Sequence, residues 1–447
     1  MTASATATTE GLGRFVRIWL GQLVSLAGSA LTGFVLGVWV YLSTGSATQF
    51  ALIMLAEAVA AILVAPLAGI VVDRYDRRLV LVVSDVAAAL ATGVLLLLVA
   101  ADGLQVWHVY PITAVTAACG TFRLIGFNTM LPMMVPAALL SRANGLAQAA
   151  MAVSIVAPLA AGVLLTTIGL RGVVMLDLAS YGFAVLITLA TALPAAAVRG
   201  SGEVGAERPL VELRAGWTEL RRREGLPTLL ILLGAFDFCF GVAGVLVQPL
   251  ILSFASPATL GVLMFAGGAG MLVGSLLMSV WGGPRRPGVG VPAFLAVAGV
   301  ALMLHTLAPS ALLIGIVAPL FLATLPVITG CTMTLLQTKV DPAMLGRVMA
   351  SVRIVSQAAT ALAYALAGPL ADEVFEPLLA EGGALAGSVG AVIGTGPGRG
   401  TAFVFFVMGA VLLGLALYGR RLRVIERLPD LLHDEGEGED AAALAAG

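Results

Sequence analysis

The chain has 447 residues, of which 60% are hydrophobic and only 11% are charged. Soluble domains average nearer half apolar and a quarter charged residues, so this composition excludes an ordinary soluble protein and indicates one embedded in lipid. The formal net charge of −1 gives no sign of a nucleic-acid partner.

Twelve stretches of the chain are predicted to cross the membrane. A spanning helix needs about 20 mainly apolar residues, because the hydrocarbon core is about 30 Å thick and each residue adds about 1.5 Å. We expect spans at residues 15–42, 48–71, 79–101, 107–131, 145–167, 173–194, 226–253, 258–281, 289–308, 310–336, 345–370 and 400–419. Irregular backbone cannot face lipid, so the chain is predicted to be an all-α membrane protein.

Positive charges predict the orientation, since Lys and Arg concentrate on the cytoplasmic side of a membrane. With both termini inside, all of the 24 Lys and Arg residues fall in cytoplasmic segments except Arg123, Arg171 and Arg399. Arg171 and Arg399 fall outside, and Arg123 lies within the fourth span. If the count missed one crossing, every later loop would change sides, and its positive charges would fall outside. We therefore expect a multi-pass protein of the cell membrane with cytoplasmic termini.

The longest predicted cytoplasmic segment divides the chain between the sixth and seventh spans. It contains the amphipathic pattern VELRAGWTELRRR, which favours a helix along the membrane surface. The predicted organisation is an N-terminal tail (1–14), a six-helix bundle (15–194), a linker with an amphipathic helix (195–225), a second six-helix bundle (226–419) and a C-terminal tail (420–447).

The two halves repeat each other at a fixed offset. VPAALLSR at 135–142 aligns with VDPAMLGR at 340–347, 205 residues later, and the same offset carries Gly69 onto Gly274. These matches indicate a duplication that gives two pseudo-symmetric bundles. Internal repeats are the usual construction of secondary transporters, which bind substrate near the bilayer midplane between the repeats.

The predicted turn after the second span carries a recognisable motif. It reads GIVVDRYDRR, with the characteristic residues Gly69, Asp73, Arg74, Arg77 and Arg78. This resembles the signature G-x-x-x-D-[RK]-x-G-[RK]-[RK] of the major facilitator superfamily, with Asp76 in place of the later glycine. The resemblance implies that Asp73 faces the start of the eleventh span and closes the cytoplasmic side. A plain cluster of positive charges is the alternative.

Three further segments are similar to one exporter branch of that superfamily. They are FVRIWLGQLVSLAGSALTGFVLGVWVYLSTGS, NTMLPMMVPAALLSRANGLAQ and GTGPGRG. The branch includes enterobactin-type siderophore exporters and macrolide efflux proteins, so the resemblance implies proton-driven export of a bulky amphipathic compound. APLAAG at 157–162 keeps Pro158 and Gly162 of the exporter motif G-P-x-x-G-G. A proline kink with small-residue packing explains it equally well.

Charged residues inside the spans are candidates for proton coupling. A charge at mid-membrane costs about 2.5–3.5 kcal/mol on insertion scales, so it usually marks a pathway or a pair. The candidates are Asp237, Glu57 and Arg123. In the superfamily, spans 1, 4, 7 and 10 line the central cavity, which implies that Arg123 and Asp237 face each other. Alternatively, Arg123 binds an anionic substrate group, or each charge is part of a local hydrogen-bonded structure.

The remaining acidic residues in the spans are expected to lie nearer the membrane surfaces. We expect Asp85 to pair with the arginine cluster of the inside turn, and Asp177 and Asp372 to be solvated near the outer ends.

A polar stripe marks the first span. Gln22, Ser25, Ser29 and Thr32 follow one another at spacings of 3, 4 and 3, which places them on one helix face. Such a stripe either lines a substrate cavity or joins two buried helices. The other candidates for the cavity lining are Arg123, Asn128, Asp237, Thr324, Thr329 and Gln357.

The sequence thus predicts a secondary active transporter that works by alternating access, a proton-coupled exporter of a small amphipathic natural product, siderophore or drug. A lipid or lysophospholipid flippase of the same fold is the alternative. The expected partners are a small-molecule substrate, protons and membrane lipids, and we expect a monomer without cofactor or metal. A membrane-embedded enzyme is a remote alternative, because no HExxH, GxSxG or cysteine-pair motif occurs. A nucleotide-driven pump made of this chain alone is excluded, because the chain has no Walker motif.

Overall fold

A computed structural model describes residues 2–135, 139, 143, 146, 150–192, 217–218, 220–222, 225–340 and 342–422. Eleven helices of this described part are long and apolar enough to cross a membrane. They correspond to α1 (Thr2–Thr44), α2 (Ala47–Arg74), α3 (Arg77–Ala100), α4 (Val106–Met134), α7 (Gly169–Ala190), α10 (Leu226–Leu252), α11 (Pro257–Trp281), α12 (Pro287–Leu304), α13 (Ala311–Lys339), α14 (Pro342–Pro369) and α17 (Arg399–Leu422), and the span at α14 continues to Leu379. The all-α membrane fold is therefore confirmed.

The fifth predicted span corresponds to α6 (Met151–Thr167), an apolar helix of 17 residues. The first part of that span, like VPAALLSR, lies largely outside the described residues. Within the predicted linker helix, the guanidinium of Arg221 lies 5.1 Å from the centre of the Trp217 ring. The predicted tail and linker boundaries stay predictions, although α1 begins at Thr2, inside the segment expected to be a tail.

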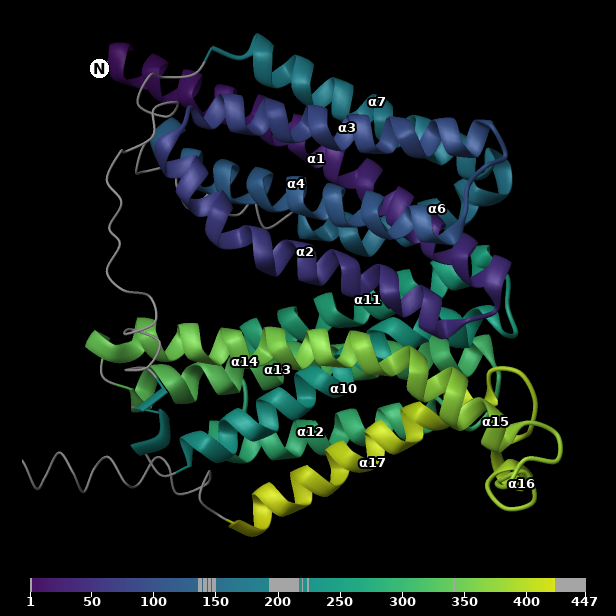
Figure 1. Ribbon diagram of the computed structural model, residues 1–447. Helices are drawn as coiled ribbons and strands as arrows, with labels where there is room; N and C mark the ends of the chain where they lie inside the picture. The colour runs from purple at the N-terminus through teal and green to yellow at the C-terminus, as the bar shows by residue number, and fades with distance from the viewer. Residues whose placement is uncertain are drawn as a thin grey trace, which may run out of the picture. The chain divides into compact units, whose positions relative to one another are not determined.

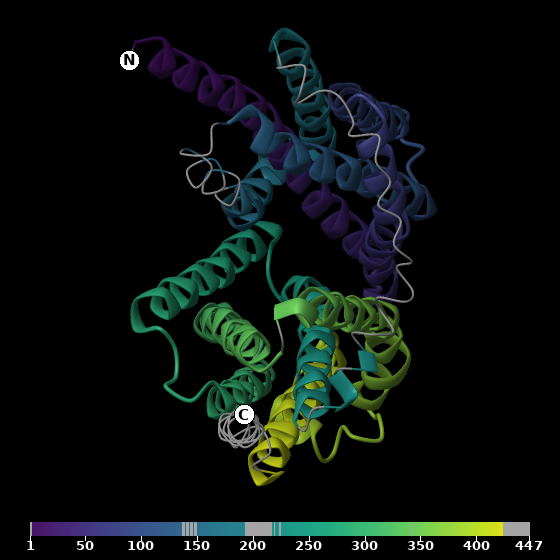
Figure 2. The ribbon, with the colours of Figure 1, turned by 90° about the vertical axis from the view of Figure 1, so that its left-hand side faces the viewer.

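The described chain forms two compact units. The first comprises Met1–Gly205 with Ala255–Phe265, and the second comprises Ala206–Phe254 with Ala266–Gly447. In the first unit α1 packs on α6 and α7, α3 packs on α4 and α7, and α2 packs on α4 (Figures 1 and 2). In the second, α10 packs on α14 and α17, and α12 packs on α13 and α17. In order along the chain, α1, α3, α4, α6 and α7 correspond to α10, α12, α13, α14 and α17. The pairs that these helices form in the second unit therefore match those of the first, as a duplication requires.

Glycines bring α11 and α13 into close contact in the second unit. A Cβ added to Gly270 would lie 2.4 Å from Cα and O of Pro319, and one added to Gly274 would lie 2.4 Å from O of Ala323. Close backbone approach of this kind is the usual use of small residues between membrane helices. At Gly69, the counterpart of Gly274, no described atom lies within 4 Å of such a Cβ.

The turn between α2 and α3 holds the arginine-rich motif. Asp76 caps α3, because its carboxylate accepts a hydrogen bond from the backbone N–H of Leu79 at 3.0 Å. An acidic N-cap accepts a hydrogen bond from an otherwise unpaired N–H, and its negative charge interacts favourably with the positive end of the helix dipole. This explains how the turn tolerates aspartate where the superfamily signature has glycine.

After α14 the backbone continues as a π-helix (Leu370–Phe375) and then as α15 (Glu376–Leu379). The Glu376 carboxylate accepts hydrogen bonds from N and Oγ1 of Thr401, at 3.1 and 3.0 Å. Thr401 lies in the first turn of α17, where backbone N–H groups lack helical partners. This contact, together with α16 (Gly390–Ile393), orders the connection between the last two spans.

Candidate functional site

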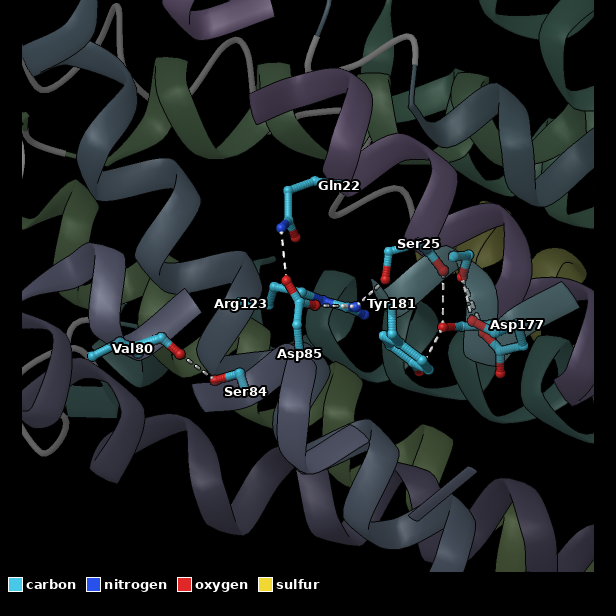
Figure 3. A network of polar contacts seen from close by, with 10 residues as sticks. Gln22, Ser25, Val80, Ser84, Asp85, Arg123, Asp177 and Tyr181 are labelled. Carbon is cyan, nitrogen blue, oxygen red and sulfur yellow. Dashed lines mark hydrogen bonds and ion pairs between the residues drawn. The ribbon is translucent and has the colours of Figure 1, made fainter. Parts of the chain in front are cut away.

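The candidate site is a polar network inside the first unit, built from α1, α3, α4 and α7 (Figure 3). At its centre Arg123 forms an ion pair with Asp85, with Nη1 of the arginine 3.0 Å from Oδ1 of the aspartate. The Asp85 side chain is fully buried and that of Arg123 is 11% exposed.

The polar stripe of α1 supplies the neutral partners of this pair. Gln22 donates a hydrogen bond from Nε2 to Oδ2 of Asp85 at 3.1 Å, and Arg123 Nη1 donates to Oγ of Ser25 at 2.6 Å. Both oxygens of the carboxylate are therefore engaged. Because breaking a buried pair leaves an uncompensated charge that costs about 3–5 kcal/mol, these contacts hold Arg123 in place.

Tyr181 of α7 lies beside the ion pair, one helical turn from a second carboxylate, that of Asp177. Its hydroxyl lies 2.8 Å from Oγ of Ser29, and its ring centre lies 5.6 Å from the Arg123 guanidinium, within cation–π range. One turn before Tyr181 lies Asp177, whose backbone carbonyl accepts a hydrogen bond from Oγ of Ser180 at 2.6 Å and whose Oδ1 lies 3.5 Å from the same hydroxyl. The Thr32 hydroxyl lies close to the Asp177 carboxylate but completes no hydrogen bond of good geometry among the described residues.

Two cavities of the first unit meet at Arg123. The first has a volume of about 260 Å³ and is lined by Ser29, Thr32, Glu57, Arg123, Asp177 and Tyr181, among others. The second also has a volume of about 260 Å³, and Trp19, Gln22, Phe127 and Asn128 line it together with Arg123. Along α4 the lining of the first ends at Arg123 and that of the second begins at Gly120. The guanidinium therefore lies where the two cavities adjoin.

Several expectations about individual residues are wrong. Asp85 pairs with Arg123 rather than with the arginines of the inside turn. Asp177 is 2% exposed and faces hydroxyl groups instead of solvent. Both lie on helix faces that turn inward, which depth along the sequence does not reveal. Among the residues of this site, Asp177 was the hardest to identify from the sequence, although its spacing of four from Tyr181 places both on one face of α7.

The candidates for the cavity lining divide between the two units. Gln22, Ser29, Thr32, Arg123 and Asn128 line the two cavities, whereas Ser25 is buried behind Arg123. In the second unit the hydroxyls of Thr324 and Thr329 donate hydrogen bonds to carbonyls of their own helix, at 2.6 and 2.8 Å. Gln357 is exposed on α14. A role for these three in a substrate cavity stays a prediction.

Asp237 lies half-buried on α10. Its carboxylate interacts with the Ser356 side chain of α14, while its Oδ2 atom is buried and has no hydrogen-bond partner within the described residues. An acidic oxygen left unsatisfied inside a membrane helix bundle is costly, so Asp237 remains a functional candidate.

The arginines of the gate motif are held within the first unit. Arg78 donates a hydrogen bond from Nε to the carbonyl of Thr188 at 3.1 Å and another to the carbonyl of Leu189. These carbonyls end α7, where a positive charge complements the helix dipole. Arg77 is buried, with Nη1 3.0 Å from the sulfur of Met133. Asp73 is half-buried at the end of α2.

An all-α protein with eleven candidate spans, a buried ion pair and adjoining polar cavities belongs to the class of polytopic membrane proteins that includes secondary transporters. A family model described as Major Facilitator Superfamily matches residues 18–364, so the chain belongs to that superfamily. It is accordingly a membrane transporter rather than an enzyme.

Relatives and solved structures agree with this assignment. The chain is 25% identical over 367 residues to macrolide efflux protein A of Streptococcus pyogenes, covering 81% of this chain and 90% of the relative. It is 26% identical over 290 residues to macrolide efflux protein A of Enterococcus faecalis, covering 63% and 88%.

Among solved structures, a bacterial homologue of the human lysosomal transporter Spinster, inward-facing and unoccupied, matches with a TM-score of 0.67 and 16% identity over 92% of this chain and 97% of that one. The nucleoside transporter NupG matches with a TM-score of 0.67 and 12% identity over 91% and 98%. At these identities the likeness concerns the fold alone.

Proposed function

We propose that this transporter is a proton-coupled exporter of a small amphipathic compound. The observation that carries the proposal is the buried pair of Arg123 and Asp85 at the junction of two cavities. Protonation of Asp85 would remove the charge that holds Arg123, and the guanidinium would then be free to change partner. A paired charge that separates when an acid takes up a proton is the element that couples a proton gradient to a conformational change.

The direction of transport rests on the relatives. Two of them are named macrolide efflux proteins, and the matches extend over most of their length. Export of an amphipathic compound from the cytoplasm across the cell membrane agrees with those names and with the predicted orientation. Asp73, together with Gly69, Arg74, Arg77 and Arg78, would close the cytoplasmic side between transport steps. A monomer is sufficient for this cycle, because each chain contains both repeats.

A lipid flippase of the same fold is the second candidate. An apolar groove of about 750 Å³ between α3 and α7, lined by Leu90, Val94, Leu97 and Leu186 among others, favours contact with an acyl chain. Tyr181 lines both this groove and the first polar cavity. An apolar groove next to a polar cavity suits any amphipathic substrate, whether a lipid or a dissolved compound. The two features together therefore do not distinguish a lipid from a drug.

The test is efflux by Asp85→Asn in proteoliposomes. The asparagine keeps the shape and still accepts from Arg123 through its Oδ1, and its Nδ2 can donate to Oε1 of Gln22 once that amide turns over, but it cannot exchange a proton. We expect gradient-driven efflux to fall at least tenfold while substrate binding stays measurable.

Ser84→Ala is the matched control for this test. Ser84 is the neighbouring buried residue, and its hydroxyl donates only to the carbonyl of Val80, one turn earlier (2.7 Å). Its efflux should match that of the unaltered protein. Full gradient-driven efflux by Asp85→Asn would refute coupling through this pair.

A further inference from the structure

We propose that the apolar groove between α3 and α7 is a binding site for one phospholipid, with an acyl chain along the groove and the phosphate group at Arg171. This lipid is a bound partner of the fold and not the transported compound, so its site does not depend on the export function. The groove has a volume of about 750 Å³ and lies on the outside of the first unit.

The groove is apolar and open to the surrounding membrane. It lies where α3 packs against α7 (Figure 1), and its lining is apolar apart from the hydroxyl of Tyr181. Leu90, Leu97 and Leu186 of that lining are 67–70% exposed. The exposed surface of a membrane helix faces hydrocarbon, and a groove left empty there would lose its dispersion contacts. An acyl chain is the group that the bilayer supplies to fill it.

Two glycines keep this groove open. Gly93 of α3 and Gly182 of α7 both line it, and no described atom lies within 4 Å of a Cβ built on either. Glycines that bring helices together behave differently, as the close approach of Gly270 to Pro319 shows. Contact between helices of the first unit therefore does not explain Gly93 and Gly182, whereas room for a chain does.

The length of the groove suits the chain of a lipid in one leaflet. Its lining on α3 extends from Val86 to Leu97, and the helix ends shortly afterwards at Ala100. At about 1.5 Å per residue this stretch is about 17 Å long, roughly half of the hydrocarbon core. The groove thus begins near the middle of the span and reaches the end that the predicted orientation places outside.

Arg171 lies at that same end, on the helix face that lines the groove. Arg78 at the start of α3 donates hydrogen bonds to the last carbonyls of α7, so the two helices are antiparallel and the start of α7 lies beside the end of α3. Arg171 is in the first turn of α7. Its spacings of 7 from Leu178 and 11 from Gly182 place all three residues on one face of the helix.

The charge of Arg171 has no partner from the protein. Its exposed side chain forms no hydrogen bond or ion pair within the described residues, not even with Asp102 of the turn after α3. Arg399, the other arginine expected outside, is buried and donates to the carbonyl of Ile393 at 2.9 Å. Arginine is uncommon on the outer side of a membrane protein, and its guanidinium is well suited to bind phosphate. A phospholipid supplies both groups, the phosphate and the chain.

Tyr181 connects the groove to the polar network, because it lines both the groove and the first polar cavity. Its hydroxyl lies 2.8 Å from Oγ of Ser29, and its ring centre lies 5.6 Å from the Arg123 guanidinium. A chain in the groove therefore packs against a residue of the network without entering the cavity.

The experiment compares two lipids that carry the same photoactivatable diazirine in one acyl chain. Phosphatidylglycerol has the phosphate, and diacylglycerol lacks it. Each is added to the purified full chain in a maltoside detergent, which has no phosphate, and the labelled peptides are quantified by mass spectrometry. We expect phosphatidylglycerol to label the groove segments of α3 and α7 several-fold more than diacylglycerol does. Arg171→Gln should remove this preference and leave labelling by diacylglycerol unchanged.

Gly93→Leu and Gly182→Leu fill the groove and should each lower its labelling by both lipids several-fold. Gly414→Leu is the matched control, because Gly414 is exposed on α17 and no described atom lies within 4 Å of its added Cβ. Labelling of the groove should not change in this control. The inference is overturned if label spreads evenly over the exposed helices, if Arg171→Gln keeps the preference, or if both leucine variants label like the unaltered protein. A groove that takes no label, as it would beneath a second copy of the chain, also overturns it.

Discussion

The ion pair between Arg123 and Asp85 is difficult to explain as a device for stability. Taking both charges out of water costs several kcal/mol per ion, and well-packed apolar residues in place of such pairs are often neutral or stabilising. The pair also has neutral partners, Gln22 and Ser25, that would satisfy either residue only in part. Its position between two cavities gives the more economical explanation, which is control of what passes between them.

We predict that Arg123 prevents protons from leaking through the first unit. A fixed positive charge between two polar cavities is an electrostatic barrier to cations. The double variant Arg123→Ser with Asp85→Asn removes the barrier without leaving a buried charge unpaired. In proteoliposomes that hold a pH-sensitive dye and carry a membrane potential, it should acidify at least several-fold faster than the unaltered protein, with no substrate present.

Arg123→Lys with Asp85 intact is the control for the leak, because it keeps the charge, and it should remain tight. Equal acidification rates for the double variant and the unaltered protein would show that Arg123 is not the barrier.

At the scale of single residues, the sequence showed which charged side chains lie inside the spans but not which partners those side chains face. Arg123 was a candidate because charges inside apolar spans are rare. The α1 stripe was visible because spacings of 3 and 4 place residues on one helix face. The partner was not visible, because Asp85 and Arg123 are 38 residues apart and only the packing of α3 on α4 brings them together. Asp177 was missed for the same reason.

At the scale of single elements, hydropathy predicted the spans well because lipid imposes both length and composition on them. It predicted the ends less well, since helical structure continues into polar sequence: α1 begins at Thr2 and α13 continues to Lys339. The π-helix after Pro369 has no hydropathy signal, because its residues resemble those of an ordinary helix end. The roles of Gly270 and Gly274 required the position of α13.

We predict that Gly270→Ala destabilises the second unit. The added methyl group would lie 2.4 Å from backbone atoms of Pro319, so α11 and α13 must move apart. Overpacking of this kind costs about 1–3 kcal/mol. The measurement is the thermal unfolding midpoint of the purified protein in detergent, which should fall by several degrees.

Gly244→Ala on α10 is the matched control, because no described atom lies within 4 Å of its added methyl group. Its midpoint should be unchanged or higher, since glycine inside a helix costs about 0.5–1 kcal/mol relative to alanine. Equal midpoints for Gly270→Ala and Gly244→Ala would contradict the close contact.

For the whole molecule, the important property is that the two units repeat each other in packing but not in charge. Corresponding helix pairs form in both, such as α1 with α7 and α10 with α17. The first unit has the ion pair of Arg123 and Asp85, whereas the carboxylate of Asp237 in the second interacts with the neutral side chain of Ser356. The 205-residue offset predicted the repetition. It did not predict the asymmetry, because charged residues placed for function are free to differ between copies that share a fold.

We therefore predict that Asp237 has its own role in coupling, separate from that of the ion pair. Its Oδ2 atom is buried and unsatisfied within the described residues, which marks the carboxyl group as a functional one. Asp237→Asn would remain permanently neutral. We expect it to abolish gradient-driven efflux while substrate binding and downhill exchange of labelled substrate both persist.

Ser356→Ala, which removes only the neighbouring hydroxyl, should shift the pH dependence of efflux and keep most of its rate, since the proton-carrying group is still present. If Asp237→Asn exports substrate against its gradient as fast as the unaltered protein, the coupling proton does not pass through this residue. Coupling would then belong to the first unit alone, and the second repeat would serve as a scaffold for the conformational change.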